Sequence, residues 1–441
     1  MNVLQLRLIS VVIAVNAVLA LPAQGQTLLS LYESARSVDA LLQSAKAQYE
    51  ANLAKAAQAE ALRYPSANLS ASGTQSFLSN NNPPVDRSYL TQTASLSGSY
   101  PLYRPANVAS LAQGRRTIEL AEVQLLSAEQ DLMIRVSQAY FDVLASQDSL
   151  AFVLAQKAAV AEQLAAAKRN FEVGTSTITD AREAQARFDL VRAQELAAEN
   201  DLQVKRLALD HLVGRPDVIP AGLATPVKLP TPAPNDYTAW VAVAEERHPT
   251  LRSARINVDL AKLEVDKAAA GHKPTLDLVA SYSRTYNYGS SSSALTAISQ
   301  NTAIGVQFNW PLFSGFATQN RIRETLALEE KARADLEAAR RGIGQATRAA
   351  FFGVLSGLGQ AEALEAAEAS SQSSLDANKL GYQVGVRINI DVLNAQSQLF
   401  QTKRDLARAR YDVLLGDLKL RQANGSLQLS DLASLNTRLK P

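Results

Sequence analysis

The side chains that most often perform catalysis or hold metals are scarce in this sequence. The 441 residues contain no cysteine, and the three histidines are His211, His248 and His272. No two histidines have the spacing of a metal-ligand pair, and the lack of thiols excludes disulfides, cysteine-ligated zinc and thiol catalysis. No converging nucleophile or acid–base group stands out. The sequence therefore predicts neither an enzyme nor a protein with a cofactor or metal.

A glycine pair and the overall charge bear on the binding of phosphates and nucleic acids. The pair Gly342-x-Gly344 lacks a preceding strand and a following Lys-Ser/Thr, so it does not form a phosphate-binding loop. Lys and Arg total 44 and Asp and Glu total 42, which gives a net charge of +2. A nucleic-acid-binding domain normally carries a strongly basic surface. We therefore expect no nucleic-acid partner.

The first 25 residues have the pattern of a cleaved secretory signal. Arg7 and the free amine form a short positive region, Leu8 to Leu21 is largely apolar, and Pro22 and small residues follow. A membrane anchor or buried helix is the alternative, but the apolar run is shorter than the roughly 20 residues of a spanning helix. No later segment looks as apolar, so we expect no transmembrane helix and a mature chain that leaves the cytoplasm.

The rest of the chain consists of two copies of one unit. Several motifs recur after about 210 residues: Tyr100-Pro101-Leu102-Tyr103 with Trp310-Pro311-Leu312-Phe313, Phe171-Glu172-Val173-Gly174 with Tyr382-Gln383-Val384-Gly385, and Asp180 with Asp391. A nearly constant shift over several motifs indicates a duplication. Each half then has the order helix, strand, strand, long helix, turn, helix.

Proline and hydrophobic periodicity place the expected elements. No proline occurs between Pro105 and Pro216 or between Pro311 and Pro441, and long proline-free runs rich in Ala, Leu, Gln and Glu favour long helices. After a signal peptide over 1–25, we expect a first repeat over 26–214, a proline-rich connector over 215–235, a second repeat over 236–425 and a C-terminal tail over 426–441. The expected long helices lie at about 105–170, 178–213, 316–381 and 389–424, and the expected strands at about 66–79, 89–102, 274–288 and 301–312.

The expected strands have two chemically different faces. Apolar residues such as Leu96 and Val306 alternate with small polar residues such as Ser97, which is the period of a strand. The strands are long enough for a bilayer crossing, which takes about 9–11 residues per tilted strand. Polar loops are expected at one end, over Ser79–Asp86 and Gly289–Ser293. At the other end lie aromatic residues, as expected at a membrane interface: Tyr100, Tyr103, Trp310 and Phe313.

A half-buried sheet in a soluble domain would also alternate, but the second face here is small, rich in hydroxyl groups and poor in charges. Four strands cannot close a barrel, because about eight is the smallest useful number. Open sheet edges are not tolerated against lipid. The edges must therefore pair with other copies of the chain. Two copies would give eight strands and three would give twelve, and periodicity does not choose between them.

Together these features resemble the TolC family of outer-membrane efflux and secretion channels. The resemblance runs from about Thr27 to Leu429 and is most specific in the two turn motifs, over 171–181 and 382–395. It implies a mainly α fold with a membrane β-barrel. In the family, the duplicated helix-strand-strand-helix unit forms a homotrimer with a twelve-stranded barrel, which a long periplasmic α-helical barrel continues.

The resemblance also implies a location, a function and partners. The chain would lie in the outer membrane of a Gram-negative bacterium, in contact with outer-membrane lipid, and extend into the periplasm. It would serve as the passive exit duct of a tripartite efflux pump or a type I secretion system. Its partners would be a periplasmic adaptor and an inner-membrane pump. Some family members carry a lipidated N-terminal cysteine, and this chain has none.

The resemblance further implies a gate at the periplasmic end. In the family, an acid in the first helical turn pairs with a Tyr and an Arg of the second turn, and the matching residues are Asp180, Tyr382 and Arg387. A second-turn acid rings the pore and favours cations, and here it is Asp391. Family members often have another acid three residues later, where this chain has Asn394. We therefore expect a weaker preference for cations.

The turn residues also have a purely structural interpretation. Gly174 and Gly385 would end long helices, since glycine adopts the left-handed conformation at little cost. Asp180 and Asp391 would begin the next helices, where an acid favours the positive end of the helix dipole. Both interpretations can hold for the same residues.

Two other classes of protein remain as alternatives. A soluble periplasmic coiled-coil adaptor or scaffold would share the long helices, but it would not have strands of bilayer length with aromatic residues at their ends. A secreted hydrolase would need a cluster of catalytic groups, which the sequence does not show. The channel hypothesis accounts for the signal, the repeat and the strand alternation together.

Overall fold

The computed structural model describes residues 26–82, 84–224 and 226–439, so the predicted signal peptide over 1–25 lies outside the described residues. The chain divides into two compact units. Unit 1 comprises the described parts of 1–45, 126–249 and 340–441, and unit 2 comprises those of 46–125 and 250–339. Each unit draws on both sequence repeats, so these units cut across the repeats expected over 26–214 and 236–425.

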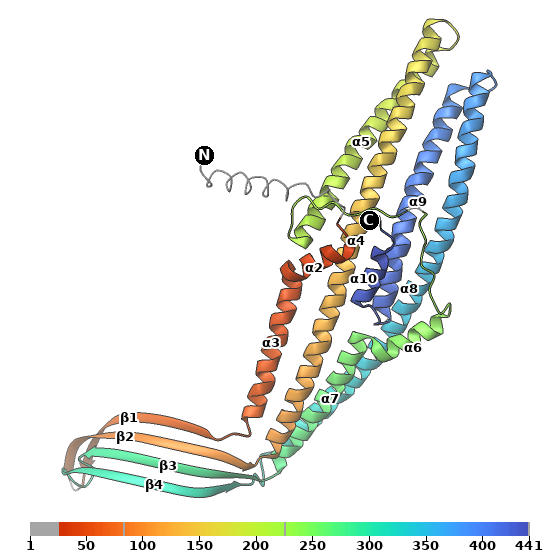
Figure 1. Cartoon of the computed structure of the whole chain (residues 1–441). Coiled ribbons are helices and arrows are strands. Elements are labelled where there is room, and N and C mark those ends of the chain that lie inside the picture. Colours follow the sequence, from red (N-terminus) through yellow and green to blue (C-terminus); the bar gives the residue numbers. More distant parts are fainter. Residues whose placement is uncertain (1–25, 83, 225, 440–441) are drawn as a thin grey trace, which may run out of the picture. The chain divides into compact units, whose positions relative to one another are not determined.

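Unit 2 contains one four-stranded antiparallel sheet. Its strands are β1 (Ser66–Asn81), β2 (Pro84–Tyr103), β3 (Thr275–Tyr288) and β4 (Thr296–Asn309), in the order β1-β2-β3-β4. Because β2 pairs with β3, strands from the two repeats share one sheet (Figure 1). Within this chain, β1 and β4 are the edge strands.

The first hairpin is longer than the sequence predicted. Most of the loop expected over Ser79–Asp86 belongs to the ladder, in which Ser79 pairs with Asp86 and Asn81 with Pro84. The polar side chains gave a turn signal, but backbone pairing does not require apolar side chains, and proline is tolerated as the first residue of a strand. In the second hairpin, β4 begins at Thr296, earlier than expected, and ends at Asn309. The polar segment that follows Gly289 lies between β3 and β4 and forms a loop.

The two faces of the sheet differ as the alternation predicted. Leu69 and Ile304 are 79% and 77% exposed on one face of the single chain. On the opposite face, hydroxyl groups meet across the strands: the Oγ atoms of Ser70 and Ser95 lie 2.7 Å apart, and Ser66 and Ser99 make a similar contact. A sheet with one apolar face and one hydroxyl-lined face suits a boundary between lipid and water.

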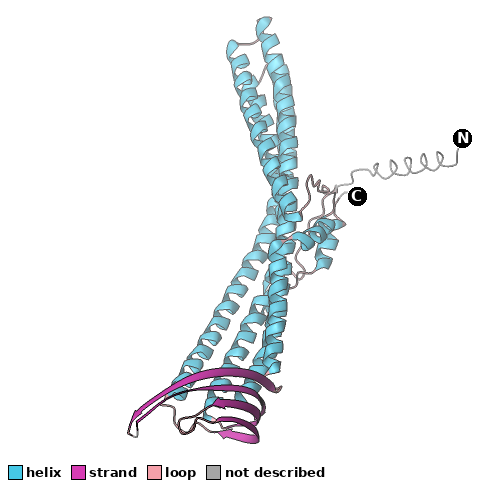
Figure 2. Ribbon diagram, turned by 90° about the vertical axis from the view of Figure 1, so that its left-hand side faces the viewer, coloured by secondary structure: helices cyan, strands magenta, loops and turns pink. Residues whose placement is uncertain are grey.

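Long helices extend from the sheet in unit 2. They are α3 (Ala40–Ala61), α4 (Pro105–Glu172), α7 (Pro249–Ala269), followed by a short 3₁₀ turn (Ala270–His272), and α8 (Ala317–Gln383). Helices α3, α4 and α8 also have residues in unit 1. Figure 2 shows the strands in magenta and the helices in cyan. Glu264 of α7 joins three helices, since it accepts hydrogen bonds from Gln113 of α4 at 2.8 Å and from Arg321 of α8 at 2.7 Å.

Unit 1 adds shorter helices and two further long ones. These are α2 (Leu28–Val38), α5 (Ile178–Val213), α6 (Tyr237–Arg247), α9 (Asn389–Ala423) and α10 (Leu429–Asn436). Its core forms from the heptad-spaced positions of α4, such as Val136 and Val143, which are fully buried. Tyr140 fixes the proline-rich connector, since its hydroxyl donates to the carbonyl of Ala221 at 2.6 Å.

Helix α4 is more apolar than the sequence analysis allowed. Among the described residues, it is the one helix that is long and apolar enough to cross a membrane by length and composition, with an 18-residue window of mean hydropathy 1.3. Apolar side chains in the middle of α4, including Tyr140, Phe141 and Leu144, are buried inside unit 1. Core packing therefore accounts for part of this apolar character.

Candidate functional site at the two helical turns

Two tight turns in unit 1 reverse the long helices. The first joins α4 to α5 and the second joins α8 to α9. Gly174 and Gly385 have φ angles of +79° and +80°, which a residue with a side chain rarely adopts. No atom lies within 4 Å of the position that a Cβ would take at either glycine, so the backbone angle and not space selects glycine.

The first turn is closed by a capping box. Thr177 precedes α5, and its Oγ1 accepts a hydrogen bond from the amide of Asp180 at 3.2 Å. The Asp180 carboxylate in return accepts from Ser176 Oγ at 2.6 Å and from the Thr177 amide at 3.1 Å. The Ser176 hydroxyl first, and then the amide and hydroxyl of Thr177, lower the pKa of Asp180 below its ordinary value. Asp180 therefore stays ionised at neutral pH and orders the turn.

The second turn lacks this cap. Ile388 occupies the position of Thr177 and makes no side-chain hydrogen bond to the helix. Asp391 instead faces Arg387, with 3.7 Å between Asp391 Oδ2 and Arg387 Nη1. The Arg387 side chain is 59% exposed, so this ion pair contributes about 0–1 kcal/mol. The second turn is therefore held less firmly by its own side chains.

The three residues expected to form a latch have separate partners in this chain. Asp180 is bonded to its own turn, Arg387 to Asp391, and the Tyr382 hydroxyl accepts from Asn170 Nδ2 at 3.4 Å. Among the described residues, no ion pair joins Asp180 to Arg387. The Tyr382 contact nevertheless links the α8–α9 turn to α4 of the other repeat.

The sequence analysis missed the polar contacts that tie the two turns together. Asn389, the first residue of α9, is completely buried. Its Oδ1 accepts from Gln163 of α4, and its Nδ2 donates to the carbonyl of Asp180 at 3.4 Å. Close by in sequence, Asn394 Oδ1 accepts from Arg187 Nη2 at 2.8 Å. A signal was available, since the repeat places Ile178 opposite Asn389, and a polar residue in the place of an apolar one calls for a partner.

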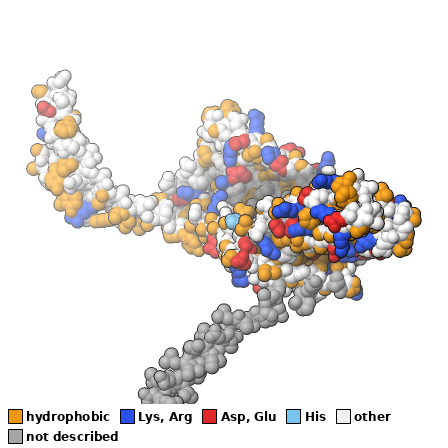
Figure 3. Space-filling view, turned by 90° about the horizontal axis from the view of Figure 1, so that it is seen from above, with side chains coloured by type: hydrophobic (Ala, Val, Ile, Leu, Met, Phe, Trp, Pro, Cys, Tyr) orange, Lys and Arg blue, Asp and Glu red, His pale blue; other side chains and the backbone are white. Residues whose placement is uncertain are grey.

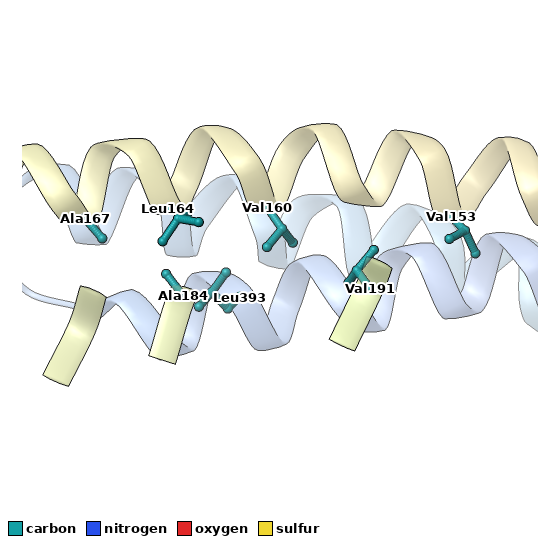
Figure 4. Close-up of a cluster of buried hydrophobic side chains, with 7 residues drawn as sticks. All are labelled: Val153, Val160, Leu164, Ala167, Ala184, Val191 and Leu393. Carbon is teal, nitrogen blue, oxygen red and sulfur yellow. The ribbon is translucent and has the colours of Figure 1, made fainter. Parts of the chain in front are cut away.

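Apolar packing supports these polar contacts. Leu393 of α9 packs into a buried cluster with side chains of α4 and α5, which are drawn together in Figure 4: Val153, Val160, Leu164, Ala167, Ala184 and Val191. Tyr382 packs against a second cluster of Leu375, Val392 and Leu399 within the α8–α9 hairpin. The two hairpins therefore touch near their turns through the apolar side chain of Leu393 and the polar contacts of Asn389, Asn394 and Tyr382.

The four aromatic residues expected at the strand ends lie partly inside and partly outside the strands. Tyr100 and Tyr103 belong to β2, opposite Leu278 and Leu276 of β3. Trp310 and Phe313 come after the end of β4 and not within it. All four side chains are exposed in the single chain. Trp310 Nε1 donates to the carbonyl of His272 at 3.1 Å, which fixes its ring beside the helix-to-strand junction.

The described part of the chain shows no group of three or more His, Asp or Glu side chains arranged to hold a metal ion. The site therefore consists of caps, glycine turns and contacts between hairpins. Such an arrangement can hold the helices together or release them.

Comparison with known proteins identifies the class. The profile of the family described as "Outer membrane efflux protein" matches residues 31–215 and 240–426. The chain is 34% identical to "Outer membrane protein TolC" of Vibrio cholerae over 423 residues, which covers 94% of each chain. It is 32% identical to "Alkaline protease secretion protein AprF" of Pseudomonas aeruginosa over 351 residues, or 79% of this chain and 72% of the relative.

A solved structure has the same fold. The crystal structure of the outer membrane protein VceC from Vibrio cholerae matches with a TM-score of 0.77 at 21% identity, over 90% of this chain and 96% of that one. The fold is therefore a helical barrel with a β-domain. The chain belongs to the outer membrane efflux protein family, which confirms the resemblance to the TolC family.

The protein is accordingly an outer-membrane exit duct for efflux or type I secretion. An outer-membrane location replaces the alternative of a soluble periplasmic adaptor. The family is a family of channels, which agrees with the scarcity of catalytic side chains in the sequence.

Proposed function

We propose that three copies of the chain form one duct and that the two helical turns of each copy form its periplasmic gate. The edges of β1 and β4 support the assembly, since each presents unpaired backbone groups that another copy would satisfy. Three four-stranded sheets would give twelve strands in one barrel. The hydroxyl-lined faces would then line a watery lumen and the apolar faces would contact lipid.

The proposal includes partners that supply energy and cargo. The helical turns would meet a periplasmic adaptor and an inner-membrane pump, and cargo would pass through the duct without chemical change. The relatives carry the names of an outer membrane protein and of a protease secretion protein. Such names suit both small cargo and proteins, because a wide duct imposes little side-chain selection.

The gate combines fixed and exchangeable contacts. Asp180 is fixed in its capping box, and its carboxylate keeps acceptor sites for a further cation. Arg387 is mostly exposed and weakly paired with Asp391, so it can exchange this acid for Asp180 at little cost. Tyr382, with its contact to Asn170, is the third member of the latch. In the closed duct, Asp391 would face the pore and attract cations.

The buried Asn389 is the single observation that carries the gate hypothesis. It bonds the start of α9 to α4 and to the first turn of α5, so the two hairpins cannot separate without breaking its contacts. A neutral hydrogen bond contributes about 0.5–1.5 kcal/mol, and several weak contacts per copy sum to a barrier that partner binding can overcome. Such a barrier suits a gate that must open repeatedly.

Single-channel conductance in planar bilayers tests the gate. We expect the double variant Asp180→Ala with Arg387→Ser to conduct more than the wild type, because both the latch and the first cap are lost. The control is Asp376→Ala, which removes an exposed contact with Gln372 on α8. Conductance of the double variant equal to that of the wild type and the control would show that these residues do not close the duct.

A further inference from the structure

One arginine lies on the apolar face of the sheet. The charged residues of the four strands are Asp86, Arg87, Asp277 and Arg284. Asp277 forms a two-point ion pair with Arg104 at 2.7 and 2.8 Å, and Arg87 donates to the carbonyl of Ser290. Arg284 is exposed and shares its face with Tyr282 and Tyr286. In a space-filling view the sheet, on the left of Figure 3, shows mainly hydrophobic and uncharged atoms.

The neighbours of Arg284 leave its charge uncompensated. Its cross-strand partners are Ala94 on β2 and Gln300 on β4, and neither is acidic. Its one described contact is with the ring of Tyr286, whose centroid lies 4.9 Å from the guanidinium carbon. Stacking on an aromatic ring orients a guanidinium and leaves its five donors available. Arg284 is therefore a positioned cation without an anion in the described chain.

The position of Arg284 along β3 indicates which part of the membrane, and therefore which anion, its side chain would contact. The Tyr103–Leu276 rung marks the end of the sheet near the helices. Arg284 lies about eight residues further along β3, which corresponds to roughly 20 Å of height for strands tilted by about 40°. The apolar band of an outer-membrane barrel is about 25 Å tall. Arg284 therefore lies at the far rim of the band, where the headgroups of the outer leaflet begin, and Tyr286 and Tyr288 follow.

A hollow in the same face adjoins the arginine. It has a volume of about 410 Å³, and its lining includes Ala71, Gly73, Gln92, Ala94 and Tyr286. Ala94 is the cross-strand partner of Arg284, and Tyr286 is the ring on which the guanidinium stacks. No atom lies within 4 Å of a Cβ position at Gly73, so small residues keep this surface open. A hollow lined partly by apolar groups beside a cation matches a ligand that has both a hydrocarbon part and an anionic group.

We propose that Arg284, oriented by Tyr286, binds a phosphate of an anionic glycolipid in the outer leaflet, while the hollow accepts part of one of its acyl chains. The proposal rests on the outer-membrane assembly described above. Guanidinium groups bind phosphates with two parallel hydrogen bonds, which makes arginine well suited to this role. A free phosphate ion would gain nothing from the hollow, and it would meet Arg284 on a face that lipid covers.

Binding of defined lipids to the full-length, membrane-extracted protein tests this site. The probes are diphosphorylated lipid A, the same lipid without phosphates, and inorganic phosphate, and the readout is bound lipid per chain by native mass spectrometry. We expect Arg284→Gln to weaken binding of diphosphorylated lipid A about tenfold, or about 1.4 kcal/mol. Arg284→Lys should retain part of the binding through its charge. Arg87→Gln is the matched control, because Arg87 contacts Ser290 and lies on the other face.

The outcomes separate the lipid site from its alternatives. Lipid A without phosphates should bind the wild type as weakly as diphosphorylated lipid A binds Arg284→Gln. The Arg284→Gln variant should bind the two lipids equally. Equal binding of both lipids to the wild type, or unchanged binding to Arg284→Gln, would overturn the proposal. Competition by inorganic phosphate at equal concentration would show a free anion site instead. Wild-type conductance of Arg284→Gln would show that the duct is intact, so failure of the lipid site and failure of the channel remain distinguishable.

Discussion

The side chain of Asn389 donates a hydrogen bond to the main-chain carbonyl of Asp180, across 3.4 Å between Nδ2 and the oxygen. The two residues lie in the first turns of corresponding helices, α9 and α5, in the two sequence repeats. The contact thus joins the two helical turns directly. The Asp180 carboxylate takes no part in this contact and accepts hydrogen bonds from Ser176 and Thr177 instead.

We expect Asn389→Ala to loosen the contact between the hairpins. The change removes the bond to the Asp180 carbonyl and leaves the side-chain amide of Gln163 without its described partner, and an unsatisfied buried group costs about 1–3 kcal/mol. Single-channel conductance should rise, and amides at the start of α9 should exchange hydrogen faster. Asn378→Ala is the control, since Asn378 only bonds back to its own helix at Ser374. If Asn389→Ala behaves like this control, the contact does not hold the turns together.

The ion preference of the duct should depend on Arg187 as well as on the acids. Asn394 accepts from Arg187 at 2.8 Å, so the single change Asn394→Asp would place the new carboxylate in an ion pair. We expect little gain in cation preference from that change alone. Adding Arg187→Gln should leave the new carboxylate at position 394 uncompensated and raise the cation-to-anion permeability ratio on the order of twofold.

Reversal potentials in a salt gradient measure this ratio. Asp391→Asn serves as the opposite control, because it removes the acid that already faces Arg387. A full increase from Asn394→Asp alone would mean that Arg187 does not compensate this position in the assembled duct.

The elements of the fold could be predicted from the sequence because local composition and pattern mark each one. Proline-free runs of helix-forming residues indicated α4 and α8, and alternation indicated the strands, although the ladder extends through Ser79–Asn81, whose polar side chains hide the pairing. The contacts between the turns could not be predicted. Asn389, Gln163 and Arg187 meet partners far away in sequence, and no period marks such a pair.

The cap chemistry could be predicted only in part. Thr177-x-x-Asp180 is a capping pattern that the sequence displays, and the acid was placed correctly at the start of α5. The difference between Thr177 and Ile388 was equally visible in the repeat, but its consequence, a second turn without a side-chain cap, depends on which donors reach the helix end.

Acid should loosen the first turn. Since the folded-state pKa of Asp180 is lowered, the charged carboxylate contributes stability that is present above the unfolded pKa of about 3.9 and is lost as the pH falls through the folded value. Asp180→Asn should therefore reduce the free energy of unfolding by about 0.5–1 kcal/mol at pH 6. The difference from the wild type should shrink steadily below pH 4. Chemical denaturation at a series of pH values measures it, and a difference that stays constant down to pH 3 would contradict the assignment.

Two buried aromatic residues occupy corresponding positions of the two repeats, so each can be changed to the residue type of the other. Tyr140 and Phe351 correspond in the two repeats and both are buried, but only the Tyr140 hydroxyl has partners: it donates to Ala221 at 2.6 Å and lies 3.4 Å from the carbonyl of Gln26. Burial raises the pKa of Tyr140, so it remains a neutral donor. Phe351 packs instead with Trp240 and Leu420.

We therefore expect both exchanges to destabilise the protein for opposite reasons. Tyr140→Phe leaves the Ala221 carbonyl unsatisfied and should cost about 1–3 kcal/mol, while Phe351→Tyr buries a hydroxyl among apolar side chains at a similar cost. Limited proteolysis distinguishes the two variants. Only Tyr140→Phe should speed cleavage within the connector over 215–235, because the Tyr140 hydroxyl holds that segment against α4. Equal cleavage rates in both variants would mean that the connector is held by its other contacts, such as the pairing of Leu223 with Leu439.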